Sequence, residues 1–267
     1  MSDTAAERWT RLLASWALPE RIVAQAPASP WAHDPATFAV DDTLERDTVA
    51  TRLAREVLPP EGGSVLDVGC GGGRSSLALV PPAATLVGFD ENPRMLEQFA
   101  AAASAAGADH LTVQGRWPDD ALSAPVADVV VCHHVFYNVP HLDRFVRALT
   151  EHARLAVVAV LPPRHPLSSM NAAWKHFWDL DRPSGPTDAD AVAVLHELGL
   201  EPEVGRTQRG SLARATSDPT TQVAAARRRL CLHPDRDPEI AAYLADHPPA
   251  WSDEVVVLRW PGGAGPS

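Results

Sequence analysis

Residues 65–73 of the chain, VLDVGCGGG, place an acidic residue and four glycines directly after a short apolar run. Glycine permits a positive backbone dihedral φ and has no Cβ, so a ligand can approach the backbone closely. The helix expected to begin at Arg74 would add free N–H groups at its amino end. Asp90 ends the next apolar run, 23 residues after Asp67, and a carboxylate in that place can accept hydrogen bonds from both hydroxyls of a ribose. The pattern predicts a binding site for a nucleoside-like ligand.

The spacing of the glycines distinguishes between classes of such sites. A dinucleotide-binding loop reads G-x-G-x-x-G, and its third glycine would fall at position 74, which is arginine. The spacing is instead Asp-x-Gly-x-Gly-x-Gly from Asp67 to Gly73. An NAD(P)-dependent oxidoreductase is therefore disfavoured.

Three histidines are candidates for a catalytic base. His133 and His134 directly follow the apolar run ADVVVC, and His165 lies in the loop PPRHPLSSMN after the run RLAVVAVL. A neutral imidazole is suited to taking a proton from an attacking hydroxyl near pH 7. The alternative is that these histidines supply only backbone contacts and shape.

The elements that position these residues alternate between strand-like and helix-like segments. Strands are expected at 64–68, 85–89, 111–114, 127–132, 154–161, 202–208 and 254–260. Continuous apolar runs suit central parallel strands that are covered on both faces. Asp42 is expected to cap a helix over 43–58, Asn92 and Pro93 to begin a helix that extends to Ala106, and Thr187 with Asp190 to form a capping box. The alternation predicts an α/β fold with a doubly wound, mostly parallel sheet.

Three stretches fall outside the alternation: an N-terminal arm (1–42) and two inserted segments (162–186 and 210–252). The main domain is expected over 43–260, with a flexible tail at 261–267. Open α/β sheets bind ligands beyond the carboxyl ends of their strands, so the arm and the insertions are expected to act as a lid or substrate wall. Candidate substrate-binding residues are Trp31, Tyr137, Trp174 and Trp178. For Trp174 and Trp178 the alternative is plain packing of one helix face against the main domain. For Tyr137 the alternative is a core or capping role.

The quoted motifs resemble those of a known family. VLDVGCGGGRSS followed by VGFDENPRMLEQFA resembles motifs I and II of the class I S-adenosylmethionine (SAM) dependent methyltransferases, and ADVVVCHHVFYNVPHLDRFVRAL resembles their motif IV region. The resemblance covers about 43–208 and the final strand. It implies a seven-stranded sheet whose last strand is antiparallel, with SAM as the cofactor.

The resemblance also implies roles for individual residues. The glycine turn would pass under the methionine part of SAM, Asp67 would hold its amino group, and Asp90 would bind the ribose hydroxyls. Residues that would line this cofactor site are Asp67, Gly69, Cys70, Gly71, Gly73, Asp90, Glu91, Met95, Arg116, Trp117 and His133. His133 and His134 would border the methyl group that is transferred.

One position departs from the family pattern. Many members carry Gly-Asp after the third strand, and the aspartate accepts a hydrogen bond from the adenine amino group. Here the place reads Gly115-Arg116-Trp117-Pro118-Asp119. Asp119, a main-chain carbonyl, or packing of Trp117 on the adenine face are the alternatives for this contact.

Composition and motif IV limit the choice of substrate. The formal net charge of -11 disfavours nucleic acid as the main partner, because proteins that bind phosphate backbones usually have a basic face. Methyltransferases that act on nucleobase amino groups usually carry Asn/Asp-Pro-Pro-Tyr/Phe in motif IV, whereas this chain has Cys132-His133-His134-Val135-Phe136. We therefore predict methyl transfer to oxygen or nitrogen of a small organic molecule. A methyltransferase acting on RNA or protein, and a non-catalytic SAM-binding protein, are the alternatives.

The remaining features concern compartment and assembly. The three cysteines, Cys70, Cys132 and Cys231, are widely spaced and show no zinc pattern, which favours a reducing compartment and predicts no metal site. The polar start and the absence of a long apolar run predict a cytoplasmic protein without a membrane span. A monomer or a homodimer is expected.

Overall fold

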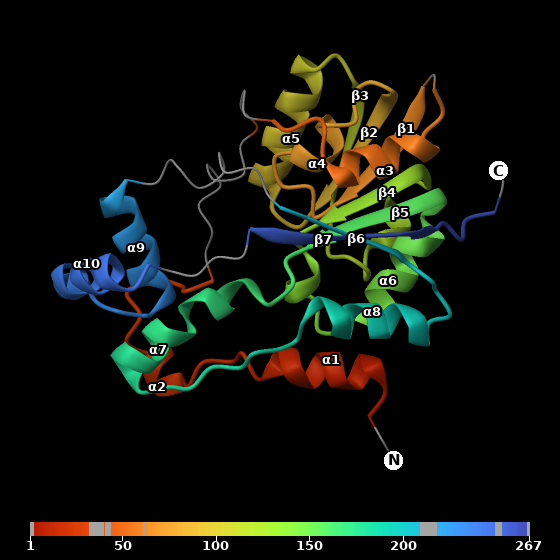
Figure 1. Cartoon of the computed structure of the whole chain (residues 1–267). Helices are drawn as coiled ribbons and strands as arrows, with labels where there is room; N and C mark the ends of the chain where they lie inside the picture. Colours follow the sequence, from red (N-terminus) through yellow and green to blue (C-terminus); the bar gives the residue numbers. More distant parts are fainter. Residues whose placement is uncertain are drawn as a thin grey trace.

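The structure is a computed structural model and describes residues 3–31, 40, 44–60, 62–208, 218–248 and 253–265. These residues form one seven-stranded sheet with the strand order β3-β2-β1-β4-β5-β7-β6 (Figure 1). The strands are β1 (Gly63–Val68), β2 (Ala83–Asp90), β3 (Asp109–Gln114), β4 (Ala127–His133), β5 (Ala153–Leu161), β6 (Glu203–Gln208) and β7 (Glu254–Pro261). β7 runs antiparallel to β5 and β6, and the pairs among β1 to β5 are parallel. The predicted doubly wound, mostly parallel sheet with an antiparallel last strand is confirmed.

Helices cover both faces of the sheet. One face carries α3 (Val49–Val57), α4 (Arg74–Leu77) and α5 (Pro93–Ala105). The other carries α6 (Leu142–Glu151) and α8 (Asp188–Glu197), with α1 (Ala5–Ala14) packed outside them (Figure 1). Short 3₁₀ helices lie at Ala121–Ser123, Phe136–Asn138, Pro166–Met170 and Pro234–Arg236. The inner strands β1, β2, β4, β5 and β7 are mostly buried because their apolar runs face a helical layer on each side. The edge strands β3 and β6 are mostly exposed.

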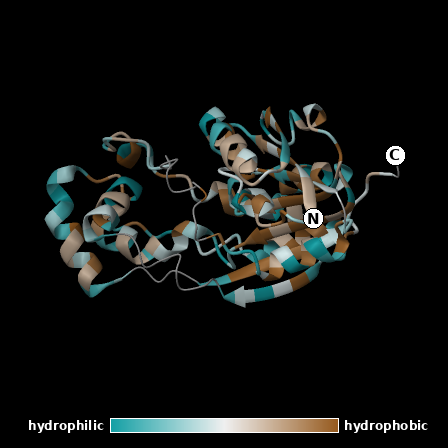
Figure 2. Ribbon diagram, turned by 90° about the horizontal axis from the view of Figure 1, so that it is seen from above, coloured by the Kyte–Doolittle hydropathy of each residue, from teal (hydrophilic) through white to brown (hydrophobic). Residues whose placement is uncertain are grey.

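The two faces have separate cores. The core under α6, α8 and α1 contains Trp9, Phe136, Phe145 and Trp260. The core under α3, α4 and α5 contains Phe99 with Val65 of β1 and Leu86 of β2. Coloured by hydropathy, the central strands are mostly brown, while the outer helices carry many teal residues (Figure 2).

The predicted helix starts have two outcomes. The Asn92 side chain accepts a hydrogen bond from Arg94 N with Pro93 at the first helical position, and Thr187 and Asp190 form the capping box of α8. Both predictions are confirmed. The predicted helix 43–58 is shorter, because Thr48 caps α3 in a box with Thr51; Asp42 lies outside the described residues.

A second group of helices lies to one side of the sheet in both views (Figures 1 and 2). It consists of α2 (Glu20–Val23), α7 (Asn171–Trp178), α9 (Pro219–Arg229) and α10 (Asp237–Asp246), and we call it the helical cluster. Its core contains Ile22, Trp174, Leu230 and Ile240. The N-terminal arm and the two inserted segments therefore pack together.

Backbone hydrogen bonds hold the first residues of the tail in place. Gly262, Gly263 and Ala264 donate backbone hydrogen bonds to Leu155, Thr150 and Ala153 at 2.8–3.0 Å. The described part of the tail thus continues the pairing of β7 instead of leaving the sheet at Pro261.

Candidate functional site

A cleft of about 2770 Å³ lies at the carboxyl ends of the parallel strands. Its wall combines the sheet edge, the loops after β1, β2, β4 and β5, and parts of the N-terminal arm and of the inserted segments. Most of the residues that the sequence singled out line it: Trp31, Gly69, Cys70, Gly71, Asp90, Glu91, Met95, Arg116, Trp117, His133, His134, Tyr137 and His165. Asp67, Gly73, Trp174 and Trp178 are not among the lining residues.

The glycine turn is built from residues with positive φ. Gly69, Gly71 and Gly73 have φ of 70°, 51° and 90°. The N–H groups of Gly69 and Cys70 both donate to the carbonyl of Phe89, at 2.8 and 3.1 Å, which fixes the turn against the end of β2. A Cβ at Gly69 would lie 2.6 Å from Cγ2 of Val135, and one at Gly73 would lie 2.9 Å from the Phe99 ring. Gly69 therefore allows Val135 of the cleft wall to pack closely, and Gly73 allows Phe99 of the core to do so.

The substitution Gly69→Ala tests the close approach at this turn. Left-handed backbone costs an L-residue about 1–2 kcal/mol, and the contact with Val135 adds a steric cost. We expect lower stability by about 2 kcal/mol and weaker SAM binding, measured by urea unfolding and calorimetry. Gly107→Ala is the matched control, because Gly107 has φ of 71° but a Cβ added there would meet no atom within 4 Å. Equal losses in both variants would show that only the backbone conformation matters.

Asp67 is fully buried beneath the turn. Its Oδ2 accepts hydrogen bonds from Ser76 Oγ at 2.7 Å and Ser76 N at 3.3 Å. Its Oδ1 is buried and has no hydrogen-bond partner. Burial raises the pKa of this carboxyl to about 7, although the bonds from Ser76 oppose the shift. In this structure Asp67 holds the start of α4, and its contact with a ligand stays a prediction.

Asp90 joins the ends of β1 and β2. Its Oδ2 accepts a hydrogen bond from Gly71 N at 3.0 Å, and its Oδ1 accepts one from Asn92 N at 2.9 Å. A carboxylate has about four lone-pair sites, so capacity for further donors remains. The carboxylate lines the cleft beside the glycine turn.

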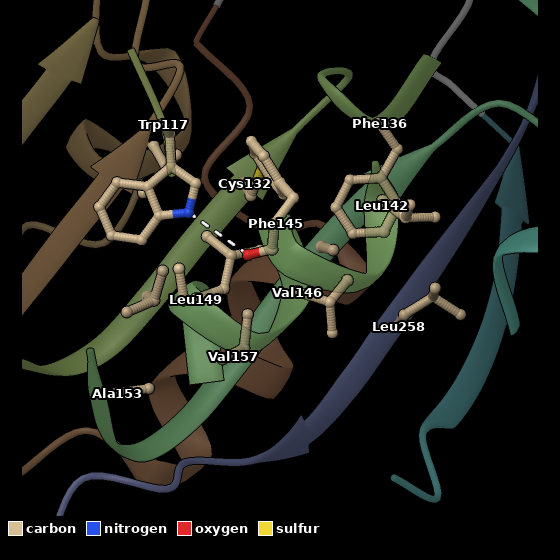
Figure 3. Packing of buried hydrophobic residues seen from close by; sticks show 14 of the residues in the cluster. Trp117, Cys132, Phe136, Leu142, Phe145, Val146, Leu149, Ala153, Val157 and Leu258 are labelled. Carbon is tan, nitrogen blue, oxygen red and sulfur yellow. Dashed lines mark hydrogen bonds between the residues drawn. The ribbon is translucent and has the colours of Figure 1, made fainter. Parts of the chain in front are cut away.

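The residues expected near adenine have different environments. Arg116 is exposed and pairs with Glu91 at 3.3 Å. Trp117 is only 8% exposed, and its indole donates to the carbonyl of Phe145 at 3.3 Å within the core (Figure 3). Most of the Trp117 ring is therefore core, with a small part at the cleft. Asp119 also lines the cleft, with Arg144 3.7 Å away.

His133 and His134 lie side by side at the end of β4. His134 has φ of 62°, and its N–H donates to the carbonyl of Val160 at 2.7 Å. This left-handed turn separates the two rings, whose centroids are 6.5 Å apart at an interplanar angle of 78°. Both side chains line the cleft, so the structure places the pair where the sequence predicts it.

His165 has a different setting. Its ring stacks on Trp16 with a centroid distance of 4.0 Å and meets the edge of Tyr137 at 5.5 Å. Its Nδ1 accepts a hydrogen bond from Leu167 N at 3.2 Å. Burial, with a contribution from Arg182, lowers the pKa of His165 to about 4. A weakly basic ring whose acceptor nitrogen is engaged is poorly suited to act as a general base.

The predicted aromatic substrate residues divide into two groups. Trp31 is 46% exposed and lines the cleft. Tyr137 also lines it, but the phenol donates to the carbonyl of Pro162 at 2.9 Å, and the ring stacks on Trp9. Trp174 is buried in the helical cluster, and the Trp178 indole donates to the carbonyl of Leu230 at 2.7 Å. The structure does not bring Trp174 and Trp178 to the cleft, because both face the core of the helical cluster.

Val135 and Arg164 are among the cleft residues that the sequence does not single out. Val135 packs where a Cβ of Gly69 would lie, and Arg164 lines the cleft immediately before His165. Neither carried a signal, because an isolated valine or arginine in a loop has no distinctive spacing.

The described residues contain no candidate metal site and no candidate membrane span. No group of three or more His, Cys, Asp or Glu residues there is placed to hold a metal ion. Nor does any described helix combine the length and apolar character needed to cross a bilayer.

Part of the chain matches a known type of domain, and the fold is similar to that of solved structures. Residues 65–156 match the model of a family described as a methyltransferase domain. The chain is similar in structure to a SAM-dependent methyltransferase from Thiobacillus denitrificans in complex with S-adenosyl-L-homocysteine (18% identity, TM-score 0.51, 93% of this chain and 99% of that one). It is also similar to magnesium protoporphyrin IX methyltransferase from Synechocystis with bound S-adenosyl-L-homocysteine (16%, 0.51, 82% and 81%). A third similar structure concerns conversion of a disulfide bond into a thioacetal group during echinomycin biosynthesis (16%, 0.54, 89% and 89%).

The sheet order and the antiparallel last strand are those of the class I methyltransferase fold. Residues 65–156 match a methyltransferase domain, and the similar structures share the fold. No curated protein matches the sequence.

Proposed function

We propose that this protein transfers a methyl group from SAM to an oxygen or nitrogen of a small organic molecule. The observation that carries the proposal is the hydrogen bond between Asp90 and the amide of Gly71. It joins the glycine turn and the second acidic residue in one surface that lines a large cleft.

The residues at this surface fit SAM. Gly69 and Gly71 line the cleft and carry no side chain there. Beneath them Asp67 keeps a buried oxygen without a hydrogen-bond partner. Gly69 and Gly71 would support the methionine part, Asp67 its amino group, and Asp90 the ribose hydroxyls. Further residues placed along the ribose and adenine are Glu91, Met95, Arg116 and Trp117.

SAM supplies an electrophilic methyl group when it is bound. The chain's task is to hold the acceptor in line with that methyl and to exclude water, which supplies much of the rate enhancement by itself. A hydroxyl acceptor must also lose its proton, and His133 or His134 would take it at a ring nitrogen. An amine that is already neutral would need no base.

The surroundings of the cleft favour a small acceptor. The N-terminal arm and both inserted segments contribute residues to its wall, including Trp16, Leu167 and Arg229. Such a wall suits a molecule that is enclosed, as ligand pockets enclose most of a small ligand. Two of the similar structures are connected by name with small molecules, magnesium protoporphyrin IX and echinomycin.

Asp90→Ala is expected to weaken SAM binding by about 1–3 kcal/mol, because hydrogen bonds to a charged group are lost. Calorimetry with SAM and with NADH measures the change and the selectivity. Asp109→Ala is the control, since Asp109 is exposed at the opposite end of the parallel strands. Binding of NADH without binding of SAM would contradict the proposed cofactor site.

The acceptor class is tested by methyl transfer itself. The protein is incubated with SAM and, separately, with phenols, alcohols, amines, bulk RNA and a protein mixture, and formation of S-adenosyl-L-homocysteine is followed. Turnover with a small molecule is expected. Turnover with RNA or protein alone would overturn the small-molecule proposal, and SAM binding without any turnover would favour a non-catalytic role.

A further inference from the structure

The cleft wall after β5 has a rigid backbone. Arg164 pairs with Thr187 in an isolated antiparallel bridge, and the N–H of Asp188 donates to the carbonyl of Pro163 at 3.1 Å. The carbonyl of His165 accepts from Ser168 N at 2.9 Å. The two consecutive side chains, Arg164 and His165, are therefore presented to the cleft from a fixed base.

His165 offers one polar atom to the cleft. The side chain is 8% exposed, it lines the cleft, and its Nδ1 accepts from Leu167 N. That hydrogen bond assigns the ring proton to Nε2, which forms no hydrogen bond with any described residue. The stacking on Trp16 holds the ring in place. Because its pKa is lowered, the imidazole is neutral at pH 7 and presents an N–H donor.

Arg164, the preceding residue, contributes a positive charge to the same cleft. Its side chain is exposed at the cleft, and within the described part of the chain its guanidinium forms no ion pair or hydrogen bond. The acidic side chains on this part of the wall, Asp188 and Glu254, both pair with Arg206. The Arg164 guanidinium is therefore available to a ligand, and its planar fork matches a carboxylate.

We propose that the methyl acceptor is an organic acid whose carboxylate is bound by the Arg164 guanidinium and the His165 Nε2–H. This inference rests on the proposed function and names its substrate class. His165 is then a residue that positions the substrate, and the role of base is left to His133 or His134.

Binding of matched probes to the protein saturated with S-adenosyl-L-homocysteine tests the proposal. The probes are 4-hydroxybenzoate, 4-hydroxycinnamate and indole-3-acetate, each paired with its methyl ester, and affinities are measured by ligand-observed NMR. At least one acid is expected to bind more tightly than its ester. Arg164→Gln should reduce that preference by about tenfold through loss of a charge-assisted pair, with the affinity of the ester unchanged.

Two further variants complete the experiment. His165→Phe keeps an aromatic ring against Trp16 but lacks the donor, and it should also lower the affinity of the acid. Arg147→Gln is the control, because Arg147 is exposed on α6 and does not line the cleft. If the His165 variant does not fold, the Arg164 variant and the comparison of acid with ester decide the question.

The outcomes separate this inference from the proposed function. Failure of the unaltered protein to bind SAM or S-adenosyl-L-homocysteine would overturn the proposed function itself. Binding of S-adenosyl-L-homocysteine with no acid preferred over its ester, or with a preference that survives in Arg164→Gln, would overturn only the carboxylate site.

Discussion

The Asp67→Asn variant is expected to have a higher free energy of unfolding than the wild type. This difference should grow as the pH rises from about 4 to about 7. The folded-state pKa of Asp67 is raised from 3.8 to about 7 by burial. In this pH window the unfolded state binds fewer protons than the folded state, so the stability of the wild type falls as the pH rises. Each pH unit corresponds to about 1.4 kcal/mol, giving a total of about 4 kcal/mol. Asparagine does not titrate, so urea unfolding of both proteins across this range isolates the effect.

A second aspartate provides a control of opposite sign. Burial alone would raise the pKa of Asp128, but hydrogen bonds from Ser64 and the charge of Arg154 lower it. Its contribution to stability is present above the unfolded pKa and is lost as the pH falls. The Asp128→Asn variant should therefore be less stable than the wild type at neutral pH. A pH-independent difference for Asp67→Asn would refute a buried, titrating carboxylate under the turn.

The same Asp67→Asn variant should bind SAM more weakly, by about 1–3 kcal/mol, because an ionised acceptor for the amino group is lost. Wild-type affinity should rise with pH up to about 7, where Asp67 becomes ionised, and then level off. Calorimetry at several pH values measures both effects. A variant that is stabilised and yet binds SAM normally would show that Asp67 serves only the turn.

The second large effect is expected at the histidine pair. With a hydroxyl acceptor, either His133→Asn or His134→Asn should lower kcat by about 10²–10⁴ with little change in SAM affinity. Asparagine suits position 134, because it tolerates the positive φ found there.

Suppose that both variants keep a kcat within roughly tenfold of the wild-type value on an acceptor that the wild type methylates. Neither histidine would then be a base. Catalysis would then depend on alignment of the acceptor alone. His110→Asn controls for a general effect of removing a histidine, because His110 is exposed on β3 and does not line the cleft.

The parts of the fold that local sequence determines could be predicted. Asn92 with Pro93 and Thr187 with Asp190 act within a few residues of themselves, and each begins a helix as expected. Gly69 and Asp90 lie at the ends of adjacent strands, so sheet topology alone brings them together. The helix before β1 begins later than the sequence predicts, because the Thr48–Thr51 capping box gives a weaker signal than an aspartate.

The parts that depend on contacts distant in sequence could not be predicted. The setting of His165 is created by Trp16 and Arg182, and Trp16 comes from the N-terminal arm. The spacing of Trp174 and Trp178 indicates an apolar helix face. It does not show whether that face contacts the cleft or the core of the helical cluster. Periodicity gives the direction of a side chain on its own helix and not the identity of its neighbour.

The helical cluster has a consequence for the order of folding. Ile22 and Ile240 share its core although more than 200 residues separate them in the chain, whereas the turn at Gly69 and the carboxylate of Asp90 need only one β-α-β unit. During synthesis the nucleoside-binding edge can form as soon as β2 has emerged, long before α10 exists. Closing so long a loop carries an entropic cost that must be met before any contact is gained. We therefore expect the acceptor side of the cleft to be completed last, after the sheet that supports it is already in place.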